Sequence, residues 1–304
     1  MSRINEIKDK VILISPLNWG MGHVSRCISL IEKLRFNNTI IIACNEDQKK
    51  IFTQYHPNLQ YEDVEVYPFK FSKKRSFLWS LLTNFRGLIK HSYIDQRKCQ
   101  QLCDKWEVDL VISDHRYGFY SKRNHNIFLT HQVKLPLAWY LWLAQKYHEK
   151  LLRNFQEIWI VDDLIINLAG ILSTPVENIP YHFIGFLSRF DNNISLNKSN
   201  ENYLLLSGPA EFWGILINRF DNEDITAIIG PSEAKDFVSK TRIPFYESSN
   251  WLLVDEKLKT CNKIFGYIGY TTLMDLQFLK CSYELIPCPG QLEQEYLKKH
   301  TYQK

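Results

Sequence analysis

One early loop reads Ser15-Pro16-Leu17-Asn18-Trp19-Gly20-Met21-Gly22-His23-Val24-Ser25-Arg26. It follows an apolar run of strand length, Val11 to Ser15, and precedes a segment in which Ile28, Ile31 and Leu34 recur at helical spacing. Glycines between a strand and a helix let backbone N–H groups approach a ligand, and the helix N-terminus favours anions. The sequence therefore predicts a binding loop at the carboxyl end of the first strand of an α/β sheet.

The glycine spacing in this loop narrows the chemistry. It lacks the G-x-G-x-x-G of a dinucleotide fold and the Gly-Lys-Ser/Thr of a P-loop, which disfavours hydride transfer and NTP hydrolysis. His23 directly follows the second glycine, where an imidazole can accept a proton from a hydroxyl near neutral pH. The alternative is a histidine that caps the helix or packs at a domain boundary. His23 is the candidate base, and Asn18, Gly20 and Gly22 are candidate binding residues.

Apolar runs of strand length alternate with helical stretches in both halves of the chain. The first half has Val11 to Ser15, Thr39 to Cys44, Leu110 to Ser113, Ile127 to Thr130 and Ile158 to Val161, and the second has Tyr203 to Leu206, Ala227 to Ile229, Trp251 to Val254, Lys263 to Phe265 and Tyr283 to Ile286. Asn and Ser dominate Asp191 to Asn202, which is typical of a linker. The pattern predicts an α/β fold of two Rossmann-like domains, 1–190 and 191–304, that face each other across a cleft.

Composition limits the class of protein. The 304 residues suffice for two domains of ordinary size, and 37 Lys and Arg against 33 Asp and Glu give a net charge of +4, too small to indicate nucleic-acid binding. Seven scattered cysteines without a Cys-x-x-Cys pair predict neither a disulfide framework nor a zinc site, and they favour a reducing, cytoplasmic compartment. Because no apolar run reaches roughly 18 residues, we expect a chain that is neither secreted nor membrane-spanning.

Two late loops have the features of a phosphate and sugar site. Gly266 to Asp275 joins a strand to a helix, and its N–H groups and hydroxyls suit a diphosphate, with Asp275 suited to a ribose. Thr272-x-x-Asp275 also matches a helix-capping pattern, so these residues can serve as a cap alone. Ile286 to Tyr296 then opens another helix with Gln291 and Gln294, whose amides suit sugar hydroxyls or serve solubility alone.

Further candidates end two strands of the first half. Asp114, His115 and Arg116 follow one predicted strand, where function concentrates in open α/β sheets. Asp114 either orients His23 or a substrate hydroxyl, or it forms an ion pair with Arg116 that orders the loop. His131 ends the next strand and is a candidate of the same kind.

A basic amphipathic helix is predicted between Pro68 and Lys90. Its apolar residues are Phe77, Leu78, Leu81, Leu82, Phe85, Leu88 and Ile89, with Lys73-Lys74-Arg75 before them and Arg86 among them. Such a helix either rests on an anionic membrane, where Trp139 to Trp142 can join the same face, or packs on the sheet.

Taken together, these loops resemble the nucleotide-sugar glycosyltransferases with two facing Rossmann domains (the B-type fold), especially the group containing the N-acetylglucosaminyltransferase that makes the lipid-linked peptidoglycan precursor. The likeness covers nearly the whole chain in layout. Its motifs, in order, are Asn18-Trp19-Gly20-Met21-Gly22-His23, Ser113-Asp114-His115-Arg116-Tyr117-Gly118, Thr130-His131-Gln132, Ile184-Gly185 with Leu187-Ser188-Arg189-Phe190, Ser207-Gly208-Pro209, and Gly269 through Gln294. They look closest to a bacterial branch whose late loop ends in Pro-Gly-Gln-x-Glu-Gln-Glu-Tyr.

The resemblance implies an inverting hexosyltransferase that moves a sugar from a nucleotide diphosphate donor, usually a UDP-sugar, to an acceptor hydroxyl. His23 would face the acceptor, and the donor would lie in the C-terminal domain. The implied donor contacts are Gly269, Thr271 and Thr272 at the phosphates, Asp275, Gln291 and Gln294 toward the ribose or sugar, and also Arg189, Gly208 and Glu293. A lipid-linked or other cell-envelope glycan precursor would be the acceptor, met at the inner face of the membrane. With no metal-ligand cluster visible, we expect metal-independent chemistry and no cofactor.

The chain departs from this family pattern at two points. Relatives commonly have Arg-Ser-Gly where it has Tyr267-Ile268-Gly269, which removes a cation and a hydroxyl beside the diphosphate, so donor affinity is reduced unless Thr271 and Arg189 compensate. It also ends at Lys304, short of the final helices that in relatives return to the first domain. Two alternatives stay open: a sugar-nucleotide epimerase, since such enzymes share this two-domain layout, and a degenerate, non-catalytic sugar-nucleotide binder, which the two departures favour.

Overall fold

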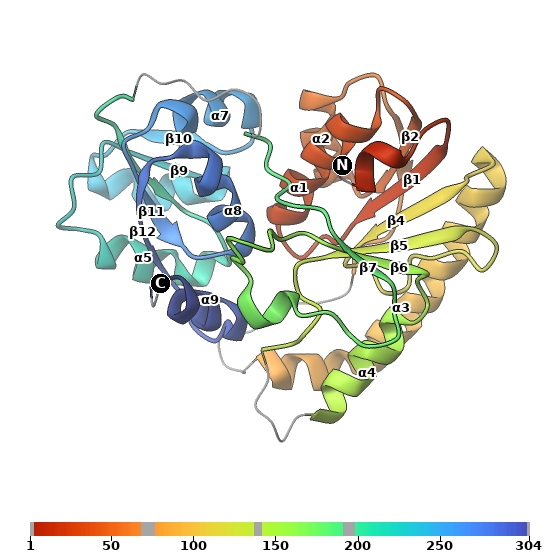
Figure 1. Ribbon diagram of the computed structural model, residues 1–304. Helices are drawn as coiled ribbons and strands as arrows, with labels where there is room; N and C mark the ends of the chain where they lie inside the picture. Colours follow the sequence, from red (N-terminus) through yellow and green to blue (C-terminus); the bar gives the residue numbers. More distant parts are fainter. Residues whose placement is uncertain (1–2, 68–76, 137–141, 191–197, 303–304) are drawn as a thin grey trace. The chain divides into compact units, whose positions relative to one another are not determined.

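A computed structural model of the chain describes residues 3–67, 77–136, 142–190 and 198–302. Contacts divide it into two compact units, Met1–Leu187 (unit 1) and Ser188–Lys304 (unit 2). The boundary lies three residues before the domain boundary at 190 that the sequence suggests. Each unit is an α/β layer structure with its own parallel sheet (Figure 1).

Unit 1 contains a seven-stranded sheet. Its elements are β1 (Val11–Pro16), α1 (Met21–Leu34), β2 (Thr39–Cys44), α2 (Glu46–Tyr55), β3 (Gln60–Asp63), α3 (Phe77–Trp106), β4 (Leu110–Asp114), β5 (His125–Thr130), α4 (Trp142–Leu152), β6 (Glu157–Ile160) and β7 (Tyr181–Phe183). The strand order is β3-β2-β1-β4-β5-β6-β7, and every pairing is parallel. The order reverses between β1 and β4, which makes their carboxyl ends the place where such sheets bind ligands.

Unit 2 repeats this arrangement with five strands. Its elements are β8 (Asn202–Leu205), α5 (Trp213–Arg219), β9 (Ala227–Gly230), α6 (Lys235–Val238), β10 (Phe245–Glu247), α7 (Trp251–Thr260), β11 (Lys263–Tyr267), α8 (Tyr270–Leu279), β12 (Ser282–Ile286) and α9 (Leu292–Tyr302). The order β10-β9-β8-β11-β12 is again parallel throughout, with its reversal between β8 and β11. The two Rossmann-like sheets that the sequence predicts are therefore present.

Both cores form where the strands are apolar on each face. In unit 1, Leu13 and Ile41 point to the side of the sheet that Cys99 and Leu102 of α3 cover. Figure 1 shows α1 and α2 on the other side of that sheet. In unit 2, Phe265 packs with Phe220 and the residues of α5 in one buried cluster. Each sheet is thus a rigid platform for the loops at its strand ends.

Several expectations about elements need correction. Trp251 to Val254 is the first turn of α7 and not a strand, because Asn250 caps a helix there: its side chain accepts a hydrogen bond from the backbone N–H of Leu253 at 3.1 Å. Asn202, placed in the linker, begins β8. The strands β3, β7 and β10 were not expected, since they are short and partly polar.

Part of the sequence interpretation falls outside the described residues. Residues 191–197 of the expected linker, the Lys73-Lys74-Arg75 run and residues 137–141 are among them. The helical spacing around Leu88 and Ile89 does belong to a helix, α3, in which both residues are half-buried. No helix in the described part of the chain is long and apolar enough to span a membrane.

Candidate functional site

The loop that follows β1 is fixed by its neighbours. The backbone N–H of Leu17 donates to the carbonyl of Asp114 at 2.9 Å, which ties the loop to β4. The side chain of Asn18 accepts from the backbone N–H of Tyr67 at 3.0 Å, so this candidate binding residue also serves the loop itself. Gly20 precedes α1 with φ 156° and ψ 158°, a backbone conformation that suits glycine. These contacts place the first turn of α1, with Gly22 and His23, at the switch point of the sheet.

His23 and Asp114 meet at this point. The Nδ1 atom of His23 lies 3.1 Å from Oδ2 of Asp114, although 91 residues separate them in sequence. Asp114 is fully buried at the end of β4, whereas the His23 side chain is 17% exposed. An imidazole oriented by a buried carboxylate through one nitrogen can present the other nitrogen to a ligand, which is the arrangement of a general base.

A buried arginine completes the cluster. Arg26 lies one turn after His23 on α1, is 1% exposed, and binds both carboxylate oxygens of Asp114, with Nε to Oδ2 at 2.9 Å. Its Nη1 also lies 3.0 Å from Nδ1 of His131, which brings this predicted residue into the same group. Sequence reasoning missed Arg26, although its spacing of three residues from His23 on a predicted helix was a usable signal.

The expected alternative for Asp114, an ion pair with Arg116, is wrong. Arg116 is buried and binds Asp95 of α3 instead, through Nε at 3.0 Å and a second, shorter contact from Nη2. The Asp95 partner lies on the opposite side of the sheet from α1. Asp114 therefore faces α1, and Arg116 ties its loop to α3.

Burial and charge set the protonation of this cluster. Burial lowers the pKa of His23, Asp114 opposes that effect, and Arg26 adds to it, so the net shift is downward. Burial acting alone would raise the pKa of Asp114, but Arg26 and His23 hold it well below its usual range. At neutral pH, Asp114 is thus ionised and His23 is neutral, the form that accepts a proton.

His115 adds another imidazole that the sequence did not assign a role. It adopts a left-handed backbone with φ 62°, and its ring centroid lies 5.8 Å from that of His23. Its Nδ1 is 3.1 Å from the hydroxyl of Thr130, and burial keeps its pKa well below the ordinary value. The His115 ring is therefore uncharged and packs beside the ring of His23.

In unit 2 the predicted donor residues gather at the start of α8. Gly269 is the N-cap, without a side-chain cap, so the expected cap at Thr272 is wrong: Thr271 and Thr272 lie within the first turn, both half-buried. Tyr267 and Ile268, where the sequence departs from the pattern of the family that it resembles, are buried, and the Tyr267 hydroxyl donates to the carbonyl of Phe212 at 2.7 Å. The first turn of α8 offers an anion its backbone N–H groups.

Asp275 belongs to a second buried charge cluster. Its carboxylate accepts from the Ser188 hydroxyl at 2.6 Å and from Nη1 of Arg189 at 2.9 Å, while Nε of Arg189 donates to Asp255 at 2.7 Å. Burial, reinforced by the nearby Asp255, raises the pKa of Asp275 to about 6 despite Arg189. Arg189, suggested as a substitute cation for the diphosphate, thus has two carboxylate partners in unit 2, of which Asp255 was not expected.

The remaining predicted residues lie in nearby loops. Gly208 follows β8 with φ 73°, a left-handed conformation that favours glycine. Gln294 of α9 accepts from the backbone N–H of Cys288 at 2.8 Å, so its amide orders the turn before the helix. Gln291 immediately precedes α9 and Glu293 lies in its first turn.

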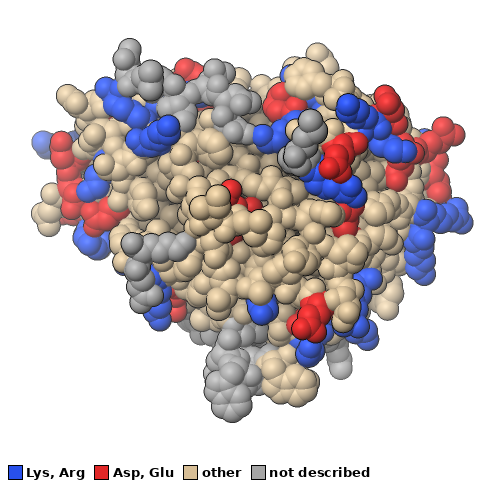
Figure 2. All heavy atoms as spheres, in the orientation of Figure 1, with Lys and Arg blue, Asp and Glu red and all other residues tan. Residues whose placement is uncertain are grey.

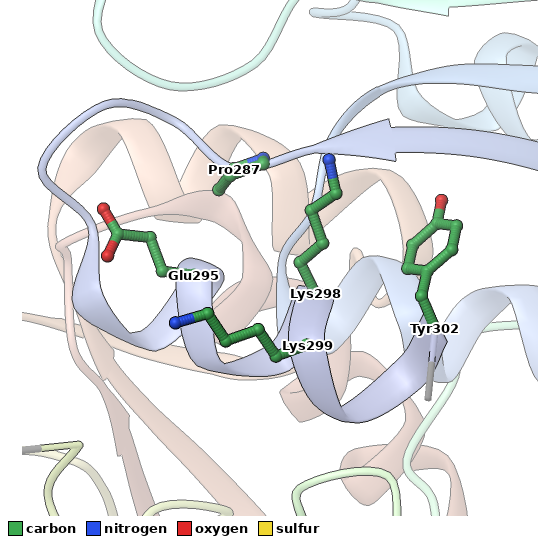
Figure 3. Close-up of a pocket in the computed structure, with 5 residues that line it drawn as sticks. All are labelled: Pro287, Glu295, Lys298, Lys299 and Tyr302. Carbon is green, nitrogen blue, oxygen red and sulfur yellow. The ribbon is translucent and has the colours of Figure 1, made fainter. Parts of the chain in front are cut away.

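A surface hollow of about 430 Å³ lies beside α9 (Figure 3). It is lined by Pro287, Glu295, Lys298, Lys299 and Tyr302. None of these is a predicted site residue, and none belongs to α8. On the face drawn in Figure 2, Lys and Arg are interspersed with Asp and Glu, as expected for nearly balanced charge.

Comparison with known proteins locates this fold. The sequence matches no protein-family model and no curated protein. In structure it is similar to the spinosyn rhamnosyltransferase SpnG (12% identity, TM-score 0.60, 95% of this chain and 84% of that one) and to Phytolacca americana UGT2 in complex with UDP-2-fluoro-glucose and pterostilbene (12%, 0.58, 97% and 83%). It is also similar to Acinetobacter baumannii MurG (9%, 0.50, 96% and 83%). The chain therefore has the fold of the glycosyltransferases with two Rossmann-like domains.

Proposed function

We propose that this protein transfers a sugar, of the hexose type, from a nucleotide diphosphate donor to an acceptor hydroxyl. The observation that carries the proposal is the His23–Asp114 contact at the switch point of unit 1. The fold supports it, since one solved structure of SpnG is complexed with thymidine diphosphate and that of UGT2 with UDP-2-fluoro-glucose. We take a UDP-sugar as the donor, as the family resemblance implies.

The chemistry assigns a role to each group. With Nδ1–H donated to Asp114, Nε2 of His23 takes the proton of the acceptor hydroxyl, whose oxygen attacks the anomeric carbon. The bond from that carbon to the diphosphate oxygen breaks, and the diphosphate leaves with the electron pair. Attack opposite the leaving group inverts the anomeric carbon. The N-terminus of α8, with Thr271 and Thr272, stabilises the departing anion without a metal ion or cofactor in this proposal.

A peripheral contact with the inner face of the cytoplasmic membrane extends the proposal. Trp142 and Leu143 at the start of α4 are 59% and 65% exposed, and α4 runs beside α3 in Figure 1. Exposed aromatic and aliphatic side chains of this kind suit a membrane interface. A lipid-linked glycan precursor is the acceptor that such a contact would serve.

One observation favours a second function. The buried Tyr267 and Ile268 leave the first turn of α8 without the cation and hydroxyl that relatives commonly have beside the diphosphate. A protein that binds a sugar nucleotide without transferring the sugar would tolerate that loss. Product analysis separates the two functions, because only a transferase needs an acceptor and releases nucleoside diphosphate with it.

Replacement of His23 by Ala tests the base assignment. We expect turnover with donor and acceptor to fall by about 10²- to 10⁴-fold, as for loss of a general base, while donor binding measured by calorimetry stays within a factor of about two. His56→Ala is the matched control, because His56 is a buried histidine at the end of α2, paired with Glu32 of α1 at 3.4 Å, and it should keep the wild-type turnover. Unchanged turnover in His23→Ala would remove His23 from the mechanism.

A further inference from the structure

The guanidinium of Arg26 contacts the other charged and imidazole groups of the unit 1 cluster, which are Asp114, His23 and His131. It binds Asp114 through two nitrogens, Nε and Nη2, in the planar two-point geometry that only arginine offers a carboxylate. Its Nη2 also lies 2.8 Å from Nδ1 of His23, and its Nη1 reaches His131. One buried side chain thus contacts the carboxylate and two of the imidazoles.

Asp114 depends on this partner. Its other neighbours are Nδ1 of His23 and the thiol of Cys27 at 3.6 Å, and the carboxylate has no exposure to water. A buried carboxylate that loses its cation is strongly disfavoured unless it gains a proton or another partner. Without Arg26, the carboxylate would therefore turn to His23, whose imidazolium form it would stabilise.

We propose that Arg26 is a positioning residue of the sugar-transfer reaction, which clamps Asp114 and thereby fixes the ring of His23 with Nε2 toward the acceptor. This inference rests on the proposed role of His23 as base. Two neighbours compete for Nδ1 of His23: the Asp114 oxygen accepts a proton, and the Arg26 nitrogen donates one. In the reactive state Arg26 binds Asp114 through Nε and Nη2, and Nδ1–H of His23 donates to the same carboxylate.

The charge of Arg26 has a second effect on His23. The groups that face the imidazole are Asp114 from β4, Arg26 on its own helix, and the rings of His115 and His131 that follow β4 and β5. Of these, Arg26 opposes the imidazolium and Asp114 favours it. Removing the cation leaves the Asp114 charge uncompensated, so the pKa of His23 rises.

Two substitutions separate the geometric effect from that of charge. Arg26→Gln removes both, so we expect the pKa of His23 to rise by about one unit or more and the acid limb of kcat/KM to move to higher pH by the same amount. Arg26→Lys keeps the charge but loses the two-point contact, so the pH limb stays in place while kcat falls by about 100-fold. Arg35→Gln is the control, an exposed arginine just after α1 bound to Glu32, and it changes neither quantity.

The pKa of His23 is measured directly by NMR titration of its ring carbon-bound proton, which needs no activity. The inference is overturned if the pKa of His23 does not move in Arg26→Gln and kcat is unchanged in Arg26→Lys. This holds even if His23→Ala is inactive. Full turnover in His23→Ala would instead defeat the proposed function, and the Arg26 role with it. If Arg26→Gln does not fold, Arg26→Lys decides: nitrogen-15 shifts of the His23 ring should show a smaller share of the Nδ1–H tautomer in Arg26→Lys than in the wild type, and an unchanged share overturns the inference.

Discussion

At the candidate site of each unit an arginine binds carboxylates, and the pKa of the carboxylate shifts in opposite directions in the two units. In unit 1, Arg26 faces the single carboxylate of Asp114, whose pKa is held well below its usual range. In unit 2, Arg189 is shared by Asp255 and Asp275, and the pKa of Asp275 is raised to about 6. A single arginine compensates the charge of two carboxylates less fully than the charge of one. The cluster in unit 2 therefore carries excess negative charge.

This excess makes the stability of the protein depend on Asp275 in mildly acidic solution. Because the folded protein holds the Asp275 proton up to a pKa of about 6, against 3.8 ordinarily, its stabilisation is complete below pH 3.8 and is lost as the pH rises through 6. Asp275→Asn carries no titrating proton, so we expect its free energy of unfolding to fall less than that of the wild type between pH 4 and pH 6.5. Urea unfolding at several pH values measures this slope.

The matched control is Asp47→Asn on α2, whose side chain is 77% exposed and paired with Lys50 on the surface. It should keep the wild-type slope. Equal slopes in wild type and Asp275→Asn would show that Asp275 titrates as an ordinary carboxylate.

The sequence located some of these residues and not others. His23 and Asp114 were found because parallel sheets bring the carboxyl ends of neighbouring strands together, whatever their separation in the chain. Arg26 was missed because its spacing from His23 was its one signal in the sequence, which does not show that its partner is the buried carboxylate of Asp114. Asp255 was missed because Trp251 to Val254 was taken for a strand, which hid the helix that carries it.

At the scale of elements, Gly118 couples the site loop to α3. A Cβ atom at Gly118 would lie 2.5 Å from the backbone Cα and O atoms of Ser92, which a helix cannot easily move. Gly118→Ala should therefore lower the free energy of unfolding by about 1–3 kcal/mol, the usual cost of overpacking. Urea unfolding of the variant measures the change.

Gly87 of α3 provides the comparison. A Cβ atom there meets nothing within 4 Å, so the same substitution should stabilise the helix by about 0.5–1 kcal/mol. Comparing the two variants separates the effect of the close contact between Gly118 and Ser92 from the general preference of helices for alanine over glycine. A Gly118→Ala variant as stable as the wild type would mean that the loop after β4 is not pressed against α3.

Most of the strands that the sequence predicted are largely buried, and β12 is a partly exposed exception. Thr39–Cys44 was predicted with its observed bounds, because five of its six residues are buried. The strands β3, β7 and β10 pair at or near the sheet edges and contain exposed polar residues, so neither alternation nor an apolar run marks them. For α7, the Asn250 cap was the missed signal, since four apolar residues in a row fit a strand and a helix equally.

At the scale of the whole molecule, the two sheets share the same parallel strand order. Each reverses its order next to its first strand, and the predicted residues of each unit lie in loops at or near that reversal. The order of the loop motifs along the chain therefore predicted the fold. It does not fix the sugar, the base or the acceptor, which depend on side chains that line a bound ligand.

Calorimetric titration of the full chain with UDP-, GDP- and dTDP-sugars and the free diphosphates tests the central claim most directly. A transferase should bind one nucleotide sugar selectively, with the heat of binding saturating at micromolar to low millimolar ligand and the folded state stabilised by mass action. Thr271→Val, which removes one hydroxyl from the first turn of α8, should weaken that binding. No saturable heat with any of these ligands at millimolar concentration would contradict the account.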